Sequence, residues 1–342
     1  MTAPGVLFIA EAIVAPSEIA KYFGEDAINA KECEIAYNAT LMALLWDAVA
    51  TKNAKLLNRG IKNLPEKLER ATWLNYVRCH DDIGLGFADQ DAALSGYDPV
   101  QHRRFLVDNF TGIFPGSPAK GMPFGDNPKT GDARISGSLA SLVGLETALE
   151  NQDEEAIDKA IKTILLLHSV ILSFGGIPLL YYGDAIGTLN SLEYLADPFK
   201  RDDNRWMNRS HFDWSKARRR HQAGTVEYRI FSALKKMIAL RKETSAFADF
   251  DNRQLFAVDN PNLLVFSRTD PQSSGSRVLV VCNFNVQSQT LLIGAIKPHG
   301  FFQQDEMKDL CSGTTVLVDN DAIVIPPLSC YWLTDWRTRK AR

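Results

Sequence analysis

The stretch Trp73-Leu74-Asn75-Tyr76-Val77-Arg78-Cys79-His80-Asp81-Asp82 decides the fold, because an apolar run of strand type leads directly into two acidic residues. A similar arrangement stands near the start of the chain, where Val6-Leu7-Phe8-Ile9 is followed by Glu11. Carboxylates at the ends of successive parallel strands are the way in which a (β/α) barrel builds an active site. The two stretches therefore predict an α/β fold in which Glu11 and Asp81 meet at one edge of a parallel sheet.

Strand and helix patterns alternate over residues 1–248, which we expect to form one α/β domain. Short apolar runs predict strands at residues 6–9, 33–37, 73–77 and 176–182. Apolar residues at helical spacing predict helices at residues 16–23, 41–50, 54–61, 136–150, 154–173 and 225–243. A closed (β/α)8 barrel needs eight strand–helix units, and this region encodes four, so we expect half of a barrel.

Two irregular segments interrupt this alternation. Residues 85–135 are rich in glycine and proline, and residues 190–220 have no clear periodicity. Connections of this length inside a compact domain are usually functional, so the first segment is interpreted as a long inserted loop subdomain.

From about residue 252 the period of the apolar residues changes from 3.6 to two. Short runs predict strands at residues 255–258, 263–266, 277–284, 290–293, 316–318, 322–325 and 330–333. Strands without intervening helices imply an antiparallel β-sandwich, so residues 249–342 are expected to form a second domain.

Composition excludes several classes of protein. The 342 residues are 45% hydrophobic and 23% charged with a net charge of -3, which is ordinary for a globular protein with a sizeable core. No wide basic patch accompanies the local run Lys216-Ala217-Arg218-Arg219-Arg220, so no nucleic-acid partner is expected. Phosphate-loop, dinucleotide, zinc-protease and hydrolase-elbow motifs do not occur.

The expected compartment is the cytoplasm, and no membrane partner is expected. Five scattered cysteines without a CxxC pair favour free thiols in a reducing environment. The apolar run over residues 161–180 contains Lys162, His168 and Gly175-Gly176, which favours a helix followed by a buried strand over a membrane span.

Glu11 is a candidate general acid. It follows an apolar strand with no basic residue near it in sequence, so burial could raise the pKa of its carboxyl, as proton donation to a leaving oxygen requires. The alternative is an acidic residue stabilised by the start of the next helix, and for Glu11 alone this structural interpretation is favoured.

Asp81 and Asp82 stand beside His80, and this string is more specific than any of its members. A carboxylate can stabilise an oxocarbenium-like transition state, and a neighbouring histidine can hydrogen-bond a sugar hydroxyl. The alternative is a pair of turn or helix-capping aspartates. The continuous string Val77-Arg78-Cys79-His80-Asp81-Asp82-Ile83-Gly84 favours the functional interpretation.

These strings resemble the α-amylase family of glycoside hydrolases (family 13), and within it the amylosucrases. The segment around Glu11 is similar to the acid/base string on the fifth barrel strand, and His80-Asp81-Asp82 matches the seventh-strand motif. Further similar strings lie at residues 121–124, 131–137, 175–184 and 204–209. The resemblance runs in order along nearly the whole chain. It implies the C-terminal half of the barrel, strands 5 to 8, followed by the family's β-sandwich domain.

The resemblance implies a role for each matching residue. Glu11 would be the acid/base and Asp81 the transition-state stabiliser, while His80 would bind glucosyl hydroxyls. Asp82 and Arg134 would meet the leaving group or the acceptor, and Arg209 would lie near the bottom of the glucosyl pocket. The reaction would be retaining α-glucosyl transfer from sucrose to an α-1,4-glucan, without a metal or organic cofactor. Hydrolysis of sucrose, or another family 13 α-glucosidase activity, is the alternative.

The chain departs from the subgroup's pattern in several places. Asn208-Arg209-Ser210 stands where His-Arg-Pro is common, and Ala185 stands where a glutamate is usual. The nucleophile of the family is the Asp of an Arg-x-Asp string upstream of the acid, whereas the strings at residues 201–203 and 268–270 both lie downstream of Glu11.

We therefore expect the isolated chain to be inactive. A non-catalytic truncated fragment, or a half-barrel that works only with a partner supplying the N-terminal half, is the competing hypothesis.

Overall fold

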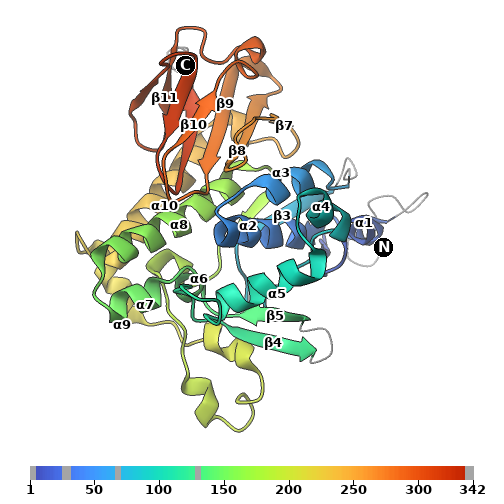
Figure 1. The fold of residues 1–342 in the computed structure, drawn as a ribbon, viewed down its shortest axis with the longest axis vertical. Helices are drawn as coiled ribbons and strands as arrows, with labels where there is room; N and C mark the ends of the chain where they lie inside the picture. The colour runs from blue at the N-terminus through green and yellow to red at the C-terminus, as the bar shows by residue number, and fades with distance from the viewer. Residues whose placement is uncertain (1–4, 25–31, 66–70, 128–131, 336–342) are drawn as a thin grey trace.

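The computed structural model describes residues 5–24, 32–65, 71–127 and 132–335 (Figure 1). A four-stranded parallel sheet forms the centre of the N-terminal part. The strand order is β1 (Ile9–Ala10), β2 (Ile35–Tyr37), β3 (Thr72–Tyr76) and β6 (Ile177–Leu179). All three pairings are parallel, so the four carboxyl ends lie on the same edge. The strands predicted at residues 33–37, 73–77 and 176–182 are confirmed, although β2 and β6 are shorter than predicted. The strand predicted at residues 6–9 is displaced, because β1 shares only Ile9 with that run.

The three longest helices of the N-terminal part begin where a polar side chain caps them. Asn38 accepts a hydrogen bond from the Leu41 N–H at the start of α2 (Ala39–Thr51), and Asp153 does the same for Ala156 at the start of α8 (Glu154–Ser173). Thr225 caps α10 (Val226–Glu243). The remaining predicted helices of this region are α1 (Pro16–Ile19), continued by a 3-10 turn over Ala20–Phe23, and α3 (Lys55–Lys62).

A buried amide network joins the central strands to the first turn of α2. The side chain of Asn38 donates to Asn75 Oδ1 over 2.9 Å, and the Asn38 backbone N–H donates to the Leu74 carbonyl. Asn75 in turn donates to the Gly175 carbonyl just before β6. Because both asparagines are almost fully buried, these bonds fix the relative positions of β2, β3 and β6.

The segment at residues 85–135 holds more regular structure than the predicted loop. It contains α4 (Asp89–Leu94), α5 (Pro99–Phe110) and a hairpin of β4 (Met122–Asn127) and β5 (Asp132–Ser136). The Asp98 side chain caps α5, and the dense glycine and proline content begins only after that helix. Ile135 bridges Ile83 in antiparallel fashion, which attaches the hairpin to the chain leaving β3.

The single helix predicted over residues 136–150 is wrong. The chain forms α6 (Leu139–Leu142) and α7 (Leu145–Glu150), separated at Gly144. Gly144 has φ 87°, and a Cβ at this position would lie 2.6 Å from the Pro118 ring, so the close packing of the hairpin segment requires glycine here.

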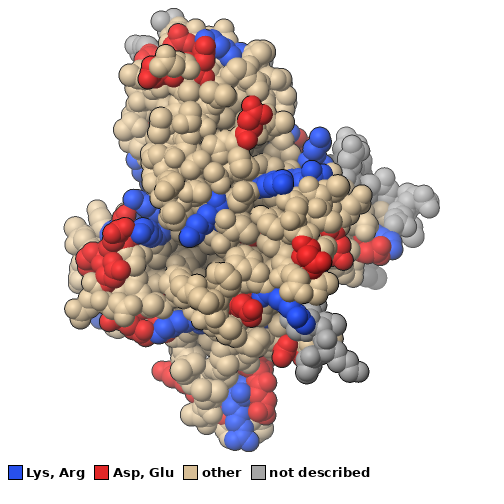
Figure 2. All heavy atoms as spheres, in the orientation of Figure 1, with Lys and Arg blue, Asp and Glu red and all other residues tan. Residues whose placement is uncertain are grey.

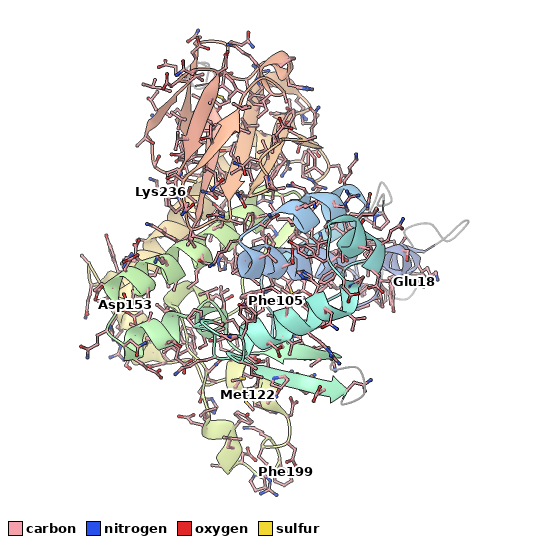
Figure 3. All side chains as sticks on the ribbon, in the orientation of Figure 1. Glu18, Phe105, Met122, Asp153, Phe199 and Lys236 are labelled. Carbon is pink, nitrogen blue, oxygen red and sulfur yellow. The ribbon has the colours of Figure 1, made fainter. Side chains whose placement is uncertain are left out.

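The segment at residues 190–220 is mostly irregular, as predicted. It contains short 3-10 turns at Glu193–Ala196, Asn204–Asn208 and Arg219–His221, and the short helix α9 (Trp214–Arg218). Phe199, labelled in Figure 3, lies at the end of the molecule opposite the sandwich and is 97% exposed.

The C-terminal part is the expected antiparallel assembly. A six-stranded sheet has the order β12-β11-β14-β9-β8-β7, and β10 pairs with β13. The bounds are β7 (Arg253–Leu255), β8 (Leu263–Asp270), β9 (Ser273–Asn283), β10 (Gln289–Leu292), β11 (Glu306–Asp309), β12 (Thr315–Leu317), β13 (Ala322–Ile325) and β14 (Ser329–Thr334). Strand β11 was not predicted, because only one of its four residues is apolar.

Three guanidinium groups bind carbonyls at the C-terminal end of α8; Arg253 and Arg268 come from the sandwich strands β7 and β8, and Arg241 comes from α10. Arg241 donates to the Leu172 carbonyl, Arg268 to the Ser173 carbonyl and Arg253 to the Phe174 carbonyl, at 2.8, 2.5 and 2.6 Å. We call these three residues the arginine clasp. They satisfy helix-terminal carbonyls that would otherwise be buried without a partner. The helix and the adjoining strand β6 are thereby tied to the C-terminal sheet.

Two further predictions concern thiols and membranes. All five cysteines are free, and Cys282 and Cys330 lie opposite each other on β9 and β14 with their sulfurs 2.9 Å apart. Among the described residues, no helix is long and apolar enough to span a membrane. The apolar run at residues 161–180 forms most of α8 and strand β6, as predicted.

Candidate active site

The two stretches that predicted the fold meet at the carboxyl edge of the parallel sheet. Glu11 follows β1, and His80 and Asp81 follow β3. His80 Nε2 lies 3.4 Å from Glu11 Oε1 and 3.9 Å from Asp81 Oδ2. Tyr37, at the end of the intervening strand β2, is close enough that the charges of Glu11 and Asp81, after burial itself, raise the pKa of its hydroxyl. Residues about seventy positions apart in sequence therefore share one site.

Glu11 is less buried than the sequence led us to expect. Its side chain is 44% exposed, and the His80 imidazole beside it is 48% exposed. The described residues thus do not supply the desolvation on which the general-acid interpretation was based. What they supply instead is a direct contact with the histidine.

Asp81 is held by two arginines. Arg205 Nη1 and Arg209 Nη2 both donate to Asp81 Oδ1, at 2.9 and 2.8 Å. Arg205 also binds Asp203 through two of its nitrogens, and this hydrogen bonding lowers the pKa of the Asp203 carboxyl. The Asp81 carboxylate is therefore fixed in orientation, with one oxygen engaged and the other facing His80.

Asp82 points to the other side of the chain and is almost fully buried. Its Oδ2 lies 3.3 Å from Arg134 Nε, and its Oδ1 lies 3.9 Å from Arg205. Burial raises the pKa of Asp82, and the Arg134 charge opposes that rise. The guanidinium groups of Arg134 and Arg205 both lie over the Phe124 ring, 4.8 and 4.5 Å from its centre.

The loop at residues 204–210 lies across the end of β3. Arg209 Nε and the Asn208 side chain both donate to the His80 carbonyl, at 2.7 and 3.2 Å. The hydroxyls of Tyr181 and Tyr182, which follow β6, donate to the carbonyls of Asn208 and Ser210. The residues that depart from the subgroup's pattern, Asn208 and Ser210, thus hold this loop against the neighbouring strand end.

Arg205 is the residue that the sequence analysis did not identify. It makes more contacts to the paired aspartates than Arg134 or Arg209 does, although it stands in the same quoted string as Arg209. Arg205 lies in the 3-10 turn at residues 204–208 and Arg209 caps its end, and both donate to Asp81 Oδ1. All six predicted site residues are described, and each contacts at least one other.

The two downstream Arg-x-Asp strings have different places. Asp203 lies within reach of Arg205 and Arg209, at 2.8 and 3.8 Å, and is charge-paired there. Arg268 belongs to the arginine clasp, far along the chain in the sandwich. Arg209 therefore pairs with Asp81 and Asp203 among the described residues, in place of the upstream aspartate that the resemblance implies.

Behind the site lie two buried ionisable side chains, Arg78 and Asp184. Arg78 is fully buried, and its guanidinium has no hydrogen-bond partner in the described part of the chain. Burial raises the pKa of Asp184 to about 8, and the nearby Arg78 charge opposes the rise. The pair joins the string before His80 to the turn after β6.

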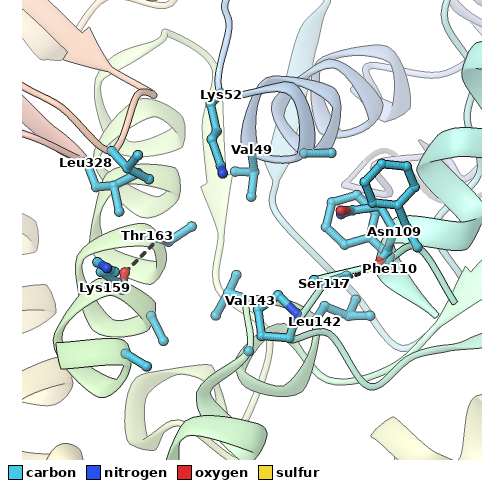
Figure 4. A pocket seen from close by; sticks show the side chains of 18 of the residues that line it. Val49, Lys52, Asn109, Phe110, Ser117, Leu142, Val143, Lys159, Thr163 and Leu328 are labelled. Carbon is cyan, nitrogen blue, oxygen red and sulfur yellow. Dashed lines mark hydrogen bonds between the residues drawn. The ribbon is translucent and has the colours of Figure 1, made fainter. Parts of the chain in front are cut away.

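A separate pocket of about 420 Å³ lies between α2, α5, α8 and the sandwich (Figure 4). Its walls are largely apolar, with Phe110, Leu142 and Leu328 among them, and its titratable side chains are Lys52 and Lys159. It offers no carboxylate for glycosidic chemistry. The face shown in Figure 2 carries mixed acidic and basic residues with no continuous basic stripe. The strand ends are thus the only described place where the predicted groups gather.

No family model matches the chain. The glucosylglycerate phosphorylase of Escherichia coli (strain K12) is 24% identical over 336 residues, which are 97% of this chain and 53% of that protein. The trehalose synthase/amylase TreS of Mycobacterium tuberculosis (strain ATCC 25618 / H37Rv) is 24% identical over 305 residues, 82% of this chain and 44% of that protein. The chain therefore spans about half the length of these relatives.

Solved structures share the fold. AmyP in complex with maltose has a TM-score of 0.60 at 13% identity, covering 96% of this chain and 55% of that one. The sucrose 6F-phosphate phosphorylase from Thermoanaerobacter thermosaccharolyticum has a TM-score of 0.57 at 16% identity, covering 83% of this chain and 49% of that one. These matches establish a barrel-like parallel sheet followed by an antiparallel β domain.

Proposed function

We propose that the chain is a member of the α-amylase family of glycoside hydrolases and carries the acid/base side of a retaining α-glucosyl-transfer site. The observation that supports the proposal is the convergence of Glu11, His80 and Asp81 at neighbouring strand ends, with contacts of 3.4 and 3.9 Å. Converging carboxylates flanking a glycosidic bond are what this chemistry requires. We also propose that residues 1–248 form the catalytic domain and residues 249–342 the accessory sandwich.

Each residue has a defined task in this proposal. Glu11 donates a proton to the glycosidic oxygen as the bond breaks, and later removes a proton from the acceptor hydroxyl. Asp81 stabilises the positive charge that develops on the sugar ring, with its free oxygen turned toward His80. His80, whose side chain is 48% exposed, presents its imidazole to a glucosyl hydroxyl.

The arginines define the leaving-group side. Arg134 is 48% exposed in its side chain, so its donors can reach a bound sugar while Nε stays beside Asp82. Arg209 fixes the orientation of Asp81 and contributes to the base of the glucosyl pocket. Arg205 joins them as a positioning residue, because its described contacts are to Asp81, Asp82 and Asp203 rather than to open space.

The nucleophile is proposed to come from outside these 342 residues. A retaining mechanism needs a second carboxylate about 5 Å from the acid, which forms the covalent glucosyl intermediate. Both carboxylate oxygens of Asp203 accept hydrogen bonds from Arg205, and Asp203 stands downstream of Glu11, so it is a poor candidate for that task. A segment or partner that supplies further strand–helix units with an Arg-x-Asp string would complete the site.

The acceptor is proposed to be neutral. Arg134, Arg205 and Arg209 are matched by Asp81, Asp82 and Asp203, so the described site has no surplus positive charge for a phosphate. This balance favours transfer from sucrose to an α-1,4-glucan, or hydrolysis, over the phosphorolysis that two of the similar proteins' names describe. Free glucose as the sole product from sucrose would favour the hydrolase, and glucose 1-phosphate would contradict the charge argument.

The test is the reaction of sucrose with the chain alone and with the completing segment added. We expect no turnover and no covalent glucosyl adduct from the chain alone, and glucan formation when the segment is present. A glucosyl adduct on the isolated chain would overturn the proposed division of the site. An inert completed protein would favour a non-catalytic, partner-binding role.

Glu11→Gln provides a sharper test in the completed protein. Loss of the proton donor should lower turnover of sucrose by about 10²- to 10⁴-fold. α-Glucosyl fluoride, whose leaving group needs no proton, should still form the covalent intermediate at close to the unmutated rate. Glu18→Gln, on the exposed face of α1, is the matched control and should leave both rates unchanged. If Glu11→Gln lowers the rates with sucrose and with α-glucosyl fluoride by the same factor, Glu11 is not the acid.

A further inference from the structure

Cys79 brings a sulfur atom into the group of polar side chains at the strand ends. Cys79 Sγ, one carboxylate oxygen of Glu11 and one ring nitrogen of His80 all lie within 4.8 Å of one another. Cys79 and His80 follow β3, and Glu11 follows the strand two places along the sheet, so three different donor atoms come from two rigid elements. This is the one such group among the residues that the structure describes.

From this juxtaposition we propose that Glu11, Cys79 and His80 form a binding site for a thiophilic divalent cation, with Zn²⁺ as the best fit. Zinc takes sulfur, nitrogen and oxygen ligands in tetrahedral arrangement, and sites with three protein ligands keep a fourth position for water. Calcium and magnesium prefer sets of oxygen ligands, so a site with one thiolate and one imidazole selects against them.

The surroundings give the site one closed and one open side. Cys79 is 6% exposed and packs in the core, whereas the Glu11 and His80 side chains are 44% and 48% exposed. A cation can therefore enter from solvent on the carboxylate and imidazole side and reach the sulfur at the back.

The sulfur already has a partner suited to a metal-bound thiolate. Hydrogen bonding from the Asp81 backbone favours the thiolate form of Cys79 and so opposes the rise that burial causes in the pKa of its thiol, which is the kind of outer contact found at metal-bound thiolates. Burial raises the pKa of the Cys79 thiol to about 11, so the free group is protonated at neutral pH. Binding is consequently an exchange in which the S–H bond breaks, the S–Zn bond forms and one proton is released to solvent.

Occupation of this site has a consequence for the activity proposed above. The cation would engage the Glu11 carboxylate and the His80 imidazole, and so remove both from a bound sugar. Zinc is therefore expected to inhibit glucosyl transfer rather than support it. The binding itself does not depend on that function, and the experiment below measures binding alone.

The test uses the untagged 342-residue chain and Zn²⁺ in competition with a chromophoric chelator. We expect one zinc ion per chain, unaffected by excess Ca²⁺. Because loss of even an outer contact typically costs 10- to 100-fold in metal affinity, Cys79→Ser should weaken binding by about 100-fold or more. Cys33→Ser, which alters a thiol outside the group, is the matched control and should bind like the unaltered chain.

Two further measurements guard against misfolding of the Cys79 variant. His80→Gln changes an exposed side chain and should also weaken zinc binding, with an unchanged circular dichroism spectrum. Co²⁺ bound to the unaltered chain should show a sulfur-to-cobalt charge-transfer band that the Cys33 variant keeps and the Cys79 variant lacks. Zinc affinity that is the same in the Cys79 and His80 variants as in the unaltered chain would overturn the proposal, as would a cobalt complex without that band.

Discussion

His168 shows how one residue inside the core sets a pH dependence. It lies on α8 with 1% exposure, and its ring nitrogen Nδ1 is 2.8 Å from the Ile164 carbonyl. Burial lowers the pKa of His168 to about 4, from a model-compound value of 6.5, so the folded protein keeps this imidazole neutral in mild acid. The unfolded chain takes up the proton at higher pH.

The sign of the effect follows from proton uptake. Between pH 6.5 and about 4 the unfolded state binds more protons at this residue, so the free energy of unfolding falls as the pH falls. A difference of 2.5 pH units corresponds to roughly 3 kcal/mol of stability lost across that window. His168→Phe should remove this contribution. Urea denaturation at several pH values should then show a free energy of unfolding that falls less steeply between pH 6.5 and about 4. If the free energy of unfolding depends on pH equally in both proteins, His168 is not the source of the acid sensitivity.

At the level of elements, the arginine clasp decides how firmly the sandwich holds the parallel sheet. Arg268 also donates to the Asp249 carbonyl and to the Asn252 side chain, and burial lowers the pKa of its guanidinium to about 9. Burying the guanidinium charge lowers the stability of the fold. Removing it would lower the stability further, because each buried oxygen left without a hydrogen-bond donor costs about 1–3 kcal/mol.

We therefore expect Arg268→Leu to lower the free energy of unfolding by about 2–4 kcal/mol, since three oxygen acceptors lose their donor at once. The measurement is the midpoint of denaturant unfolding. Arg218→Leu, an exposed arginine on α9, serves as the control and should shift stability by less than about 0.5 kcal/mol. If Arg268→Leu is as stable as Arg218→Leu, water must replace the Arg268 guanidinium with little loss in the free energy of unfolding.

Sequence patterns predicted elements well where burial alone sets the period. Helix α8 begins and ends within one residue of its prediction because Asp153 caps it and apolar residues line it without interruption. The helix predicted over residues 136–150 failed at Gly144, since only tertiary contact with Pro118 shows that the chain must turn there. Strand β11 was missed for a related reason: its pairing with β14 and β12, not its own composition, makes it a strand.

The candidate site was predictable to a similar extent. Glu11 and the His80 string were identified because a strand ends just before each of them, and their meeting follows from the parallel order of β1, β2 and β3. Arg205 was not identified, because only the folded chain brings it against Asp81 and Asp82, which lie more than a hundred residues earlier in sequence, whereas its other partner, Asp203, is local. The exposure of Glu11 was also not predictable, since it depends on which elements cover the sheet edge.

Over the whole molecule, the outer side of β1 is the least covered part of the described sheet. Val6, Leu7, Phe8 and Ile9 are 49%, 67%, 56% and 52% exposed, and β1 pairs on one side only among the described strands. Contiguous apolar residues beside an unpaired strand edge favour association. The 342-residue chain by itself is therefore expected to self-associate and to be poorly soluble.

Sedimentation velocity over a range of concentrations measures this tendency. The double variant Leu7→Lys/Phe8→Lys should shift the chain toward monomer, because two charges then flank the open edge. Leu292→Lys/Val324→Lys alters equally exposed residues of the sandwich, at 59% and 60%, and should leave the association unchanged. A monomeric chain with one cooperative unfolding transition would contradict the expectation.

The arginine clasp also has a consequence for the order in which a newly made chain can fold. The carbonyls of Leu172, Ser173 and Phe174 at the end of α8 accept hydrogen bonds from residues that lie 69, 95 and 79 positions later in the chain. These donors are Arg241, Arg268 and Arg253. A ribosome adds these residues later, so α8 and β6 emerge seconds before the groups that secure them. During that interval the apolar surface of α8 has no sandwich to pack against. Cutting the gene at the apparent domain boundary would make this interval permanent, so an expressed fragment should extend through β8.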